Sequence, residues 1–388
     1  MSNLIVQAPI NSLSFGQVSY AYLYAMYKAG MRVGVFPIGN VDMSAYSQDA
    51  GFIAWLQKSV DDRYKLLHKN STLLQFWHIS RQFQGEQIAT DKRILLTYHE
   101  LGEMTPTEIS IINTFDKVLF SSAFSKETAQ LYGAKTLIDT FVTPLEPNLE
   151  KPKLKRIGNV VQWGITGGKF EKRKNTAEII SFWAERYGNN PNHSLNCLVF
   201  NPFMGKNPQE QQQIYFAHQQ QLLMYGRDGK KRVLPINNIQ FLPHQRTNAE
   251  VNDLAAQVVV ELSGLSGGEG FNIPACRAAS FGSIVPVLNH TGHKEWMFDA
   301  VDKCRENIMI FEAGKERPAA DGLFFLPREQ NPQFNLGNFA ELTWNQFNKI
   351  CDAVEERLKK FQRADSINGD FYDWYSPKFA LQQLLTKI

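Results

Sequence analysis

Cysteine is scarce in this sequence of 388 residues: there are four, and no two of them form a C-x-x-C pair. Such wide spacing, without paired histidines, argues against a disulfide framework and a zinc site. We also expect no metal and no cofactor. Long apolar runs are lacking too, since no stretch approaches the roughly 18 residues of a membrane-spanning helix. Met1–Val6 has neither the charged start nor the long apolar run of a signal peptide. We therefore expect a soluble, cytoplasmic protein.

The net charge is small as well, since Lys and Arg number 41 and Asp and Glu 38. A balance of +3 permits an anionic ligand or a nucleic-acid partner but does not demand one. There is no internal repeat of solenoid period. Apolar residues are plentiful, at 43% of the chain, which over this length suffices for two hydrophobic cores.

The most informative stretch is a glycine-rich loop between two apolar runs. Ala256–Leu262 predicts a buried parallel strand before the loop, and Ser283–Leu288 predicts a second strand after it. Pro274 and the small residues behind it predict a helix between the loop and the second strand. Three glycines allow tight turns in the loop: Gly264, Gly267 and Gly268. Because ligands of such units bind at the carboxyl ends of the strands, the loop and its carboxylate, Glu269, are the first candidate for an active site.

The first half of the chain alternates between predicted strands and helices, which predicts a parallel sheet with helices on both faces. The strands are expected at 4–8, 32–37, 73–78, 93–100, 117–122 and 136–141, and the helices at 18–30, at 50–68, from the capping box Thr105–Glu108, and up to Leu131. Gly16 precedes a helix start, where backbone N–H groups bind phosphate or sugar hydroxyls; a plain tight turn is the alternative. His99 and Glu100 end a strand at the ligand edge; a structural histidine under a loop is the alternative.

A second alternation follows Thr143–Arg156, whose three prolines and basic run predict an interdomain linker. After a strand at 159–165, a Gly-Gly pair and several cations precede a helix at Thr176–Tyr187. Because they lie between the end of a strand and the start of a helix, Lys169 and Lys174 are candidates for an anion pocket; a solvated basic loop is the alternative. The remaining expected elements are strands at 195–200, 238–242, 306–311 and 321–327, helices at 208–224, 342–363 and 376–387, and an exposed basic turn at 226–232.

Ser266–Pro274 resembles the S-x-x-E-G-F-G-x-P motif of the large retaining group of GT-B glycosyltransferases that use nucleotide-sugar donors, glycosyltransferase family four. The pair Lys169 and Lys174 resembles the basic pair of that family, Gly16 its N-terminal loop glycine, and His99–Glu100 its His–acid step. The resemblance covers nearly the whole chain.

The resemblance implies an α/β fold of the GT-B type, with two Rossmann-like parallel-sheet domains facing a central cleft and a C-terminal helix that crosses back. The implied parts are an acceptor domain, a donor domain, and a helix that packs on the acceptor domain: residues 1–147, 148–370 and 371–388.

It also implies a retaining, metal-independent hexosyl- or pentosyltransferase whose donor is a nucleotide sugar, with a UDP-sugar as the first expectation. The implied residues are His99, Glu100 and Glu269 for catalysis, Gly16, Lys169, Lys174, Gly270 and Phe271 for the donor diphosphate, and Asn272, Ile273 and Arg277 for the nucleoside. Without a metal, paired lysines and a helix N-terminus must stabilise the charge that grows on the departing diphosphate. Glu269 would hold the hydroxyls of the oxocarbenium-like sugar through charge-assisted hydrogen bonds, and His99 would orient the sugar and the acceptor.

One position departs from the family pattern. The family has a second glutamate eight residues after the first, which holds the nucleotide ribose, and this chain has Arg277 there. Glu261 is also eight residues from Glu269, but it lies in the preceding predicted strand and does not match the motif. Ribose recognition is therefore altered, or the carboxylate comes from elsewhere in the chain.

The acceptor stays open at this point, with a bacterial or phage glycan or a small molecule as the first expectation. Gly282–Val287 also resembles the phage DNA glucosyltransferases that act on 5-hydroxymethylcytosine in duplex DNA, which implies base flipping and work in the host cytoplasm. Lys151–Arg156 and Gly226–Arg232 would then lie along phosphates. A membrane glycolipid is disfavoured, because residues 52–68 mix acidic with basic side chains. A non-catalytic nucleotide-sugar-binding relative or an epimerase is the remaining alternative.

Overall fold

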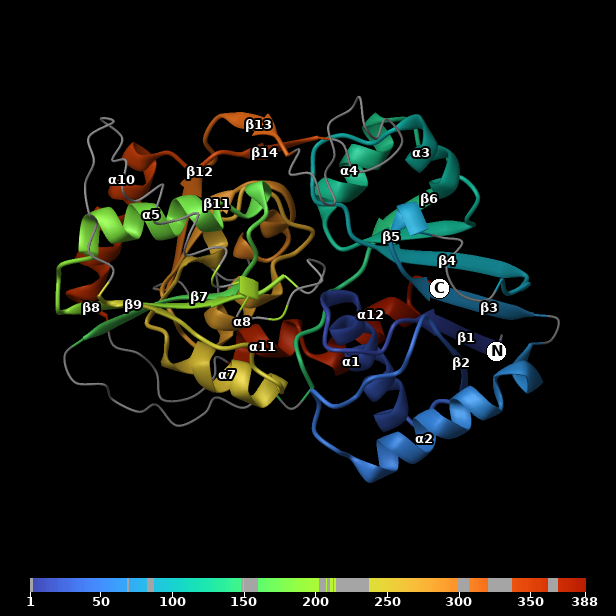
Figure 1. The fold of residues 1–388 in the computed structure, drawn as a ribbon. Helices are drawn as coiled ribbons and strands as arrows, with labels where there is room; N and C mark the ends of the chain where they lie inside the picture. The colour runs from blue at the N-terminus through green and yellow to red at the C-terminus, as the bar shows by residue number, and fades with distance from the viewer. Residues whose placement is uncertain are drawn as a thin grey trace.

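The computed structural model of the chain contains two α/β lobes that lie side by side (Figure 1). It describes residues 3–67, 70–81, 87–147, 149, 160–201, 207, 210–211, 213, 237–298, 307–319, 337–361 and 369–388. The predicted basic segments 151–156 and 226–232 and the strand at 321–327 lie outside these residues, as does most of the helix at 208–224.

The N-terminal lobe is built on a six-stranded parallel sheet in the order β2-β1-β3-β4-β5-β6. The strands are β1 (Asn3–Ala8), β2 (Val33–Pro37), β3 (Ser71–Phe76), β4 (Lys92–Thr97), β5 (Lys117–Phe120) and β6 (Leu137–Thr140), and the helices are α1 (Ser14–Lys28), α2 (Ala50–Asp61), α3 (Pro106–Ile112) and α4 (Ala123–Leu131). Their buried apolar residues form the core of this lobe. The predicted alternation of strands and helices in this half is confirmed.

Local sequence signals fix the ends of these helices. Gly30 follows the end of α1 with φ +66°, a left-handed conformation that glycine adopts without strain. Thr105 caps α3 and Glu108 completes the capping box, as the sequence predicts. The η1 turn (Arg63–Leu66) follows α2, so the helix predicted at 50–68 is shorter than expected.

The C-terminal lobe contains a second parallel sheet. Strands β7 (Val161–Gly168), β8 (His193–Val199), β9 (Ile239–Phe241) and β10 (Val260–Glu261) form it in the order β10-β7-β8-β9. A parallel bridge between Val260 and Ile284 extends it to the pair β11 (Val285–Asn289) and β12 (Ile308–Glu312). A short antiparallel pair, β13 (Glu316–Pro318) and β14 (Asn338–Ala340), lies apart from this sheet.

The described helices after β7 are α5 (Thr176–Tyr187), α7 (Asn248–Gln257), α8 (Ile273–Ser280), α10 (Trp344–Leu358), α11 (Gly369–Trp374) and α12 (Pro377–Leu385), of which α12 packs on the N-terminal lobe. The strand predicted at 256–262 is wrong in its first half, because residues 256 and 257 end α7 and only Val260 and Glu261 pair as a strand. A capping box at Thr247 and Glu250 starts α7 and outweighs the apolar run that favoured a strand. Gly167 and Gly168 likewise continue β7 rather than forming a loop.

The last helix returns to the first lobe. Figure 1 shows α12 beside α1, and its buried Ala380, Leu381 and Leu384 belong to the N-terminal core. Lys387 Nζ donates to the carbonyl of Thr140 (2.8 Å). The chain therefore crosses back as predicted, although α11 starts at Gly369, two residues before the predicted boundary at 371.

Candidate functional site

A buried carboxylate marks the candidate site. Glu269 lies on the loop between the η5 turn (Leu262–Leu265) and α8, beyond the carboxyl end of β10, and is only 5% exposed. Its Oε1 accepts a hydrogen bond from Lys174 Nζ (2.5 Å), and its Oε2 lies 3.4 Å from Arg173 Nη1. Burial raises the pKa of Glu269, but the charges of Lys174 and Arg173 outweigh it and hold the pKa at about 2. Glu269 is thus an anion at neutral pH, poised to accept hydrogen bonds from hydroxyl groups.

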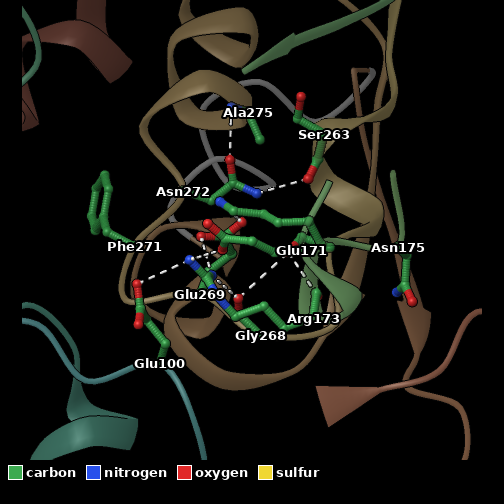
Figure 2. A network of polar contacts seen from close by, with 12 residues as sticks. Glu100, Glu171, Arg173, Asn175, Ser263, Gly268, Glu269, Phe271, Asn272 and Ala275 are labelled. Atoms are coloured by element: carbon green, nitrogen blue, oxygen red, sulfur yellow. Dashed lines mark hydrogen bonds and ion pairs between the residues drawn. The ribbon is translucent and has the colours of Figure 1, made fainter. Parts of the chain in front are cut away.

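Arg173 joins three carboxylates around this loop (Figure 2). Besides Glu269, its Nη2 lies 2.9 Å from Glu171 and 3.2 Å from Glu100, and its Nη1 donates to the carbonyl of Gly268 (2.6 Å). The sequence placed Arg173 only among the cations of the predicted anion pocket, and Glu171 was not predicted as a site residue. The available signal was an acidic residue inside the basic segment, two positions before Arg173.

Lys169 lies near the same cluster. Burial lowers its pKa, Glu171 raises it, and the charges of Lys174 and Arg173 lower it further. Of the predicted pair, Lys174 contacts Glu269 directly, and Lys169 lies near Glu171, Lys174 and Arg173; α5 follows from Thr176. Cations at this place attract an anionic ligand.

Backbone and side-chain hydrogen bonds fix the loop. The N–H of Glu269 donates to Thr291 Oγ1 (2.9 Å), and its carbonyl accepts from the N–H of Gly292 (2.8 Å). Asn272 has φ 70°, and its Oδ1 caps α8 by accepting from the N–H of Ala275. Asn272 Nδ2 donates to the carbonyl of Ser263 and also lies 2.8 Å from His293 Nε2, so the polar groups of this predicted nucleoside residue are engaged within the protein.

The glycines of the loop allow close packing as well as turns. Gly264 lies in the η5 turn, and none of Gly264, Gly267 and Gly268 has the left-handed φ that favours glycine. A Cβ at Gly267 would lie 2.0 Å from the carbonyl oxygen of Ala340, and one at Gly270 would lie 2.8 Å from the Tyr98 ring. The loop thus needs glycine because other backbone and ring atoms approach it.

The N-terminal lobe meets this loop with the segment after β4. Glu100 reaches Arg173 from the teal N-terminal ribbon in Figure 2. Ser121 Oγ donates to the carbonyl of Gly270 (2.7 Å). His99 is buried, its carbonyl accepts from Ser125 Oγ (2.8 Å), and its Nε2 has no hydrogen-bond partner within the part of the chain that the structure describes.

Among the described residues, no hydrogen bond or ion pair joins Glu269 to the remaining predicted residues. Gly16 is buried in the first turn of α1 against Asn11. The Phe271 ring packs in the core of the C-terminal lobe, 5.7 Å from Tyr375, so only its backbone faces the loop. Ile273 and Arg277 line a crevice at the junction of the lobes, together with Gln17, Glu146 and Asn248.

Glu261 plays a structural part. Its Oε1 accepts hydrogen bonds from Thr166 N (3.1 Å) and Ser263 N (3.0 Å), which tie β10 to β7 and to the turn behind it. Burial raises its pKa. Its position in the strand before the motif agrees with the sequence interpretation.

Within the described residues, no group of three or more His, Cys, Asp or Glu side chains is arranged to hold a metal ion. A search of the same residues finds no helix with the length and apolar character needed to cross a membrane.

Comparisons with known proteins yield fold neighbours alone. No family model and no curated protein matches the chain. Among solved structures, Anabaena HepE in complex with UDP and glucose matches at 12% identity with TM-score 0.58, covering 100% of this chain and 99% of that one. OtsA, a trehalose-6-phosphate synthase, matches at 10% and 0.60 (100% and 98% covered), and an E. coli trehalose-6-phosphate structure bound with UDP-2-fluoro glucose at 10% and 0.58 (100% and 98%). The fold is that of the GT-B glycosyltransferases, as predicted; the finer resemblance to family four stays a prediction.

Proposed function

We propose that the protein is a glycosyltransferase that moves a sugar from a UDP-sugar to a hydroxyl acceptor. The observation that carries this proposal is the buried, ionised Glu269 between Lys174 and Arg173, in a loop against which Glu100 of the other lobe packs. UDP and glucose bound to HepE, and UDP-2-fluoro glucose bound to the E. coli structure, support a UDP-sugar as the donor.

Binding of the donor would replace the ion pair between Lys174 and Glu269 with an ion pair between Lys174 and the diphosphate. Its diphosphate would take Lys174 from Glu269, together with Lys169, while the freed Glu269 carboxylate would accept hydrogen bonds from the sugar hydroxyls. As the nucleoside diphosphate departs, the two lysines and the first turn of α5 would stabilise its growing charge. We propose on this basis a metal-independent, retaining transfer of a hexose or pentose.

On the acceptor side, His99 would orient the acceptor hydroxyl against the sugar. Its buried Nε2 has no partner among the described residues, so a ligand hydroxyl would satisfy a polar atom that the protein leaves unpaired. Glu100 lies next to it along the chain and completes the predicted His–acid step. Gly16 and the backbone of Gly270 and Phe271 would contact the diphosphate.

The nucleoside would lie toward Ile273 and Arg277. These residues share one face of α8 and one crevice with Gln17 and Asn248. Glu146 lies in the same crevice, so a carboxylate is present near the position where the family pattern has one. We propose a glycan or a small molecule as the acceptor, and hydroxymethylated duplex DNA is tested beside it.

The test combines donor binding with transfer. Shifts in the melting temperature of the protein with a panel of nucleotide sugars identify the donor. The labelled donor is then offered to glycans, small molecules, plain DNA and hydroxymethylated DNA. We expect UDP-sugars to raise the melting temperature and one acceptor class to take label. A chain that binds donor without transfer to any acceptor or water is a binding relative, and one that binds no nucleotide sugar contradicts the proposal.

Glu269→Gln tests the carboxylate itself. We expect about a hundredfold loss of transfer, because the amide keeps the shape but loses the charge-assisted hydrogen bonds to the sugar. The control is Glu356→Gln, whose carboxylate is 72% exposed on α10, and it should transfer at the wild-type rate. Equal activity of the two variants would remove Glu269 from the site.

A further inference from the structure

Contacts between the lobes converge on the loop that carries Glu269. Ser121 Oγ donates to the carbonyl of Gly270, and the N–H of Ala123 donates to Glu295 Oε2 (2.8 Å). A Cβ placed on Gly268 would lie 3.2 Å from the carbonyl oxygen of Glu100, so the N-terminal segment also packs on the loop backbone. The geometry of this loop therefore depends on the docking of the other lobe.

An ion pair between the two lobes joins Arg173 to Glu100. One edge of its guanidinium, Nη1, holds the carbonyl of Gly268 and faces Glu269. Nη2 faces Glu100 of the N-terminal lobe at 3.2 Å and Glu171 of its own lobe at 2.9 Å. A planar guanidinium moves as one body, so an interaction at Nη2 fixes what Nη1 presents to the loop.

Burial makes this arrangement sensitive to each partner. The Arg173 side chain is 6% exposed and that of Glu171 is 3% exposed, whereas that of Glu100 is 33% exposed. A buried guanidinium is stable only with its donors satisfied. Separation of the lobes would remove Glu100 and leave Arg173 with partners of its own lobe, including Glu171 and Glu269.

Arg173 also holds the loop through its backbone. Its carbonyl accepts from the N–H of Gly267 (2.8 Å), and the carbonyl of Gly267 accepts from the N–H of Ala340 (2.8 Å). A shift of Arg173 is thus passed to Gly267 and Gly268, the two residues that precede Glu269.

We propose that Arg173 is a positioning residue that couples docking of the N-terminal lobe, through Glu100, to the orientation of Glu269. This rests on the proposed function in so far as Glu269 holds the donor sugar. Because of this coupling, Glu269 takes up the orientation that holds the donor sugar only when the N-terminal lobe is docked. A donor bound while the lobes are apart is not yet positioned for transfer. The donor diphosphate still binds through the lysines, which separates binding from turnover.

The first test needs no donor. Hydrogen–deuterium exchange is measured over residues 263–271 in wild type, in Glu100→Gln, and in Glu127→Gln as a control that removes an exposed carboxylate of the same lobe. We expect faster exchange at Gly267 and Glu269 in Glu100→Gln and no change in the control. Unchanged exchange in Glu100→Gln overturns the coupling, whether or not the chain proves to be a glycosyltransferase.

The second test uses turnover with the donor found by the melting screen. Arg173→Lys keeps the positive charge but replaces the two Nη groups of the guanidinium with a single ammonium. It should destabilise the folded chain less than a substitution that removes the charge. We expect Glu100→Gln and Arg173→Lys each to lower kcat about tenfold, with donor KM changed less than about twofold. The kcat of the double variant should be no lower than that of Arg173→Lys, because both substitutions disrupt the same Glu100–Arg173 contact.

Additive losses in the double variant, or losses confined to the melting temperature with kcat intact, contradict the positioning role. A wild-type chain that binds no nucleotide sugar refutes the proposed function instead, and the exchange experiment then decides the coupling alone.

Discussion

Glu261 and Glu269 are two buried carboxylates of one strand–loop unit, and their pKa values move in opposite directions. Burial raises the pKa of Glu261, which accepts its hydrogen bonds from uncharged donors of the protein. For Glu269 the same effect of burial is outweighed by Lys174 and Arg173. Cations placed by β7 and the turn behind it therefore decide which glutamate is available as an anion for a ligand.

Arg277 gives a prediction at this scale. It is 8% exposed, burial lowers its pKa, and the negative charges of Glu146 and Glu261 act against that lowering. Restoring the family residue with Arg277→Glu would place a third carboxylate near Glu146 and Glu261 and remove the cation, so we expect a stability loss of about 3–5 kcal/mol and no gain in donor affinity. Chemical denaturation and donor binding measure the two effects.

Arg277→Gln is the control for that variant, because it removes the cation without adding an anion, and it should be the more stable of the two. A stable Arg277→Glu chain with tighter donor binding would show instead that the position serves the ribose as in the family.

His293 predicts a pH dependence. Burial lowers its pKa to about 4 from the ordinary 6.5, with the charge of Glu269 opposing that effect. The folded chain therefore holds the ring neutral, so its contribution to stability is present above pH 6.5 and is lost as the pH falls toward 4. We expect a flatter decline of melting temperature over this window in His293→Gln, and the same slope as wild type would contradict the burial of a neutral ring.

At the scale of elements, sequence patterns predicted the strands and helices that carry their own signals. The capping box of α3 and the helix α5 are in place, and so is the proline at the start of α8. The error at 256–262 arose because an apolar run does not distinguish the end of a buried helix from a strand. The role of the loop glycines was also missed, since the atoms that crowd Gly267 come from β14, over 70 residues away in sequence.

Gly267→Ala tests that role. The new methyl would meet the Ala340 carbonyl at 2.0 Å, where backbone would have to move, so we expect a loss of about 1–3 kcal/mol and a lower melting temperature. Gly102→Ala is the matched control, because nothing lies within 4 Å of its Cβ position. Equal melting temperatures for both variants would mean that the loop has room to move.

For the whole molecule, the alternation of strands and helices with a proline-rich segment between its two halves predicted two α/β lobes, and the family resemblance implied their Rossmann-like, GT-B form. The contact of Glu100 with Arg173 was not predictable in this way. Each residue lies in its own local pattern, and no periodicity indicates which side chain of one lobe faces which side chain of the other. Partners across a cleft are set by the docking of the lobes, which is a property of the folded chain.

The return of α12 to the N-terminal lobe makes the stability of that lobe depend on the far end of the chain. Leu384 is 1% exposed in the N-terminal core, and its neighbour Leu385 is 42% exposed. We expect Leu384→Ala to cost about 2–5 kcal/mol through lost burial and a residual cavity, and Leu385→Ala to cost little. Thermal melts monitored with limited proteolysis should show the N-terminal lobe cleaved first in Leu384→Ala. Cleavage that starts in the C-terminal lobe, or equal melts for the two variants, would contradict a stabilising role of the crossing helix.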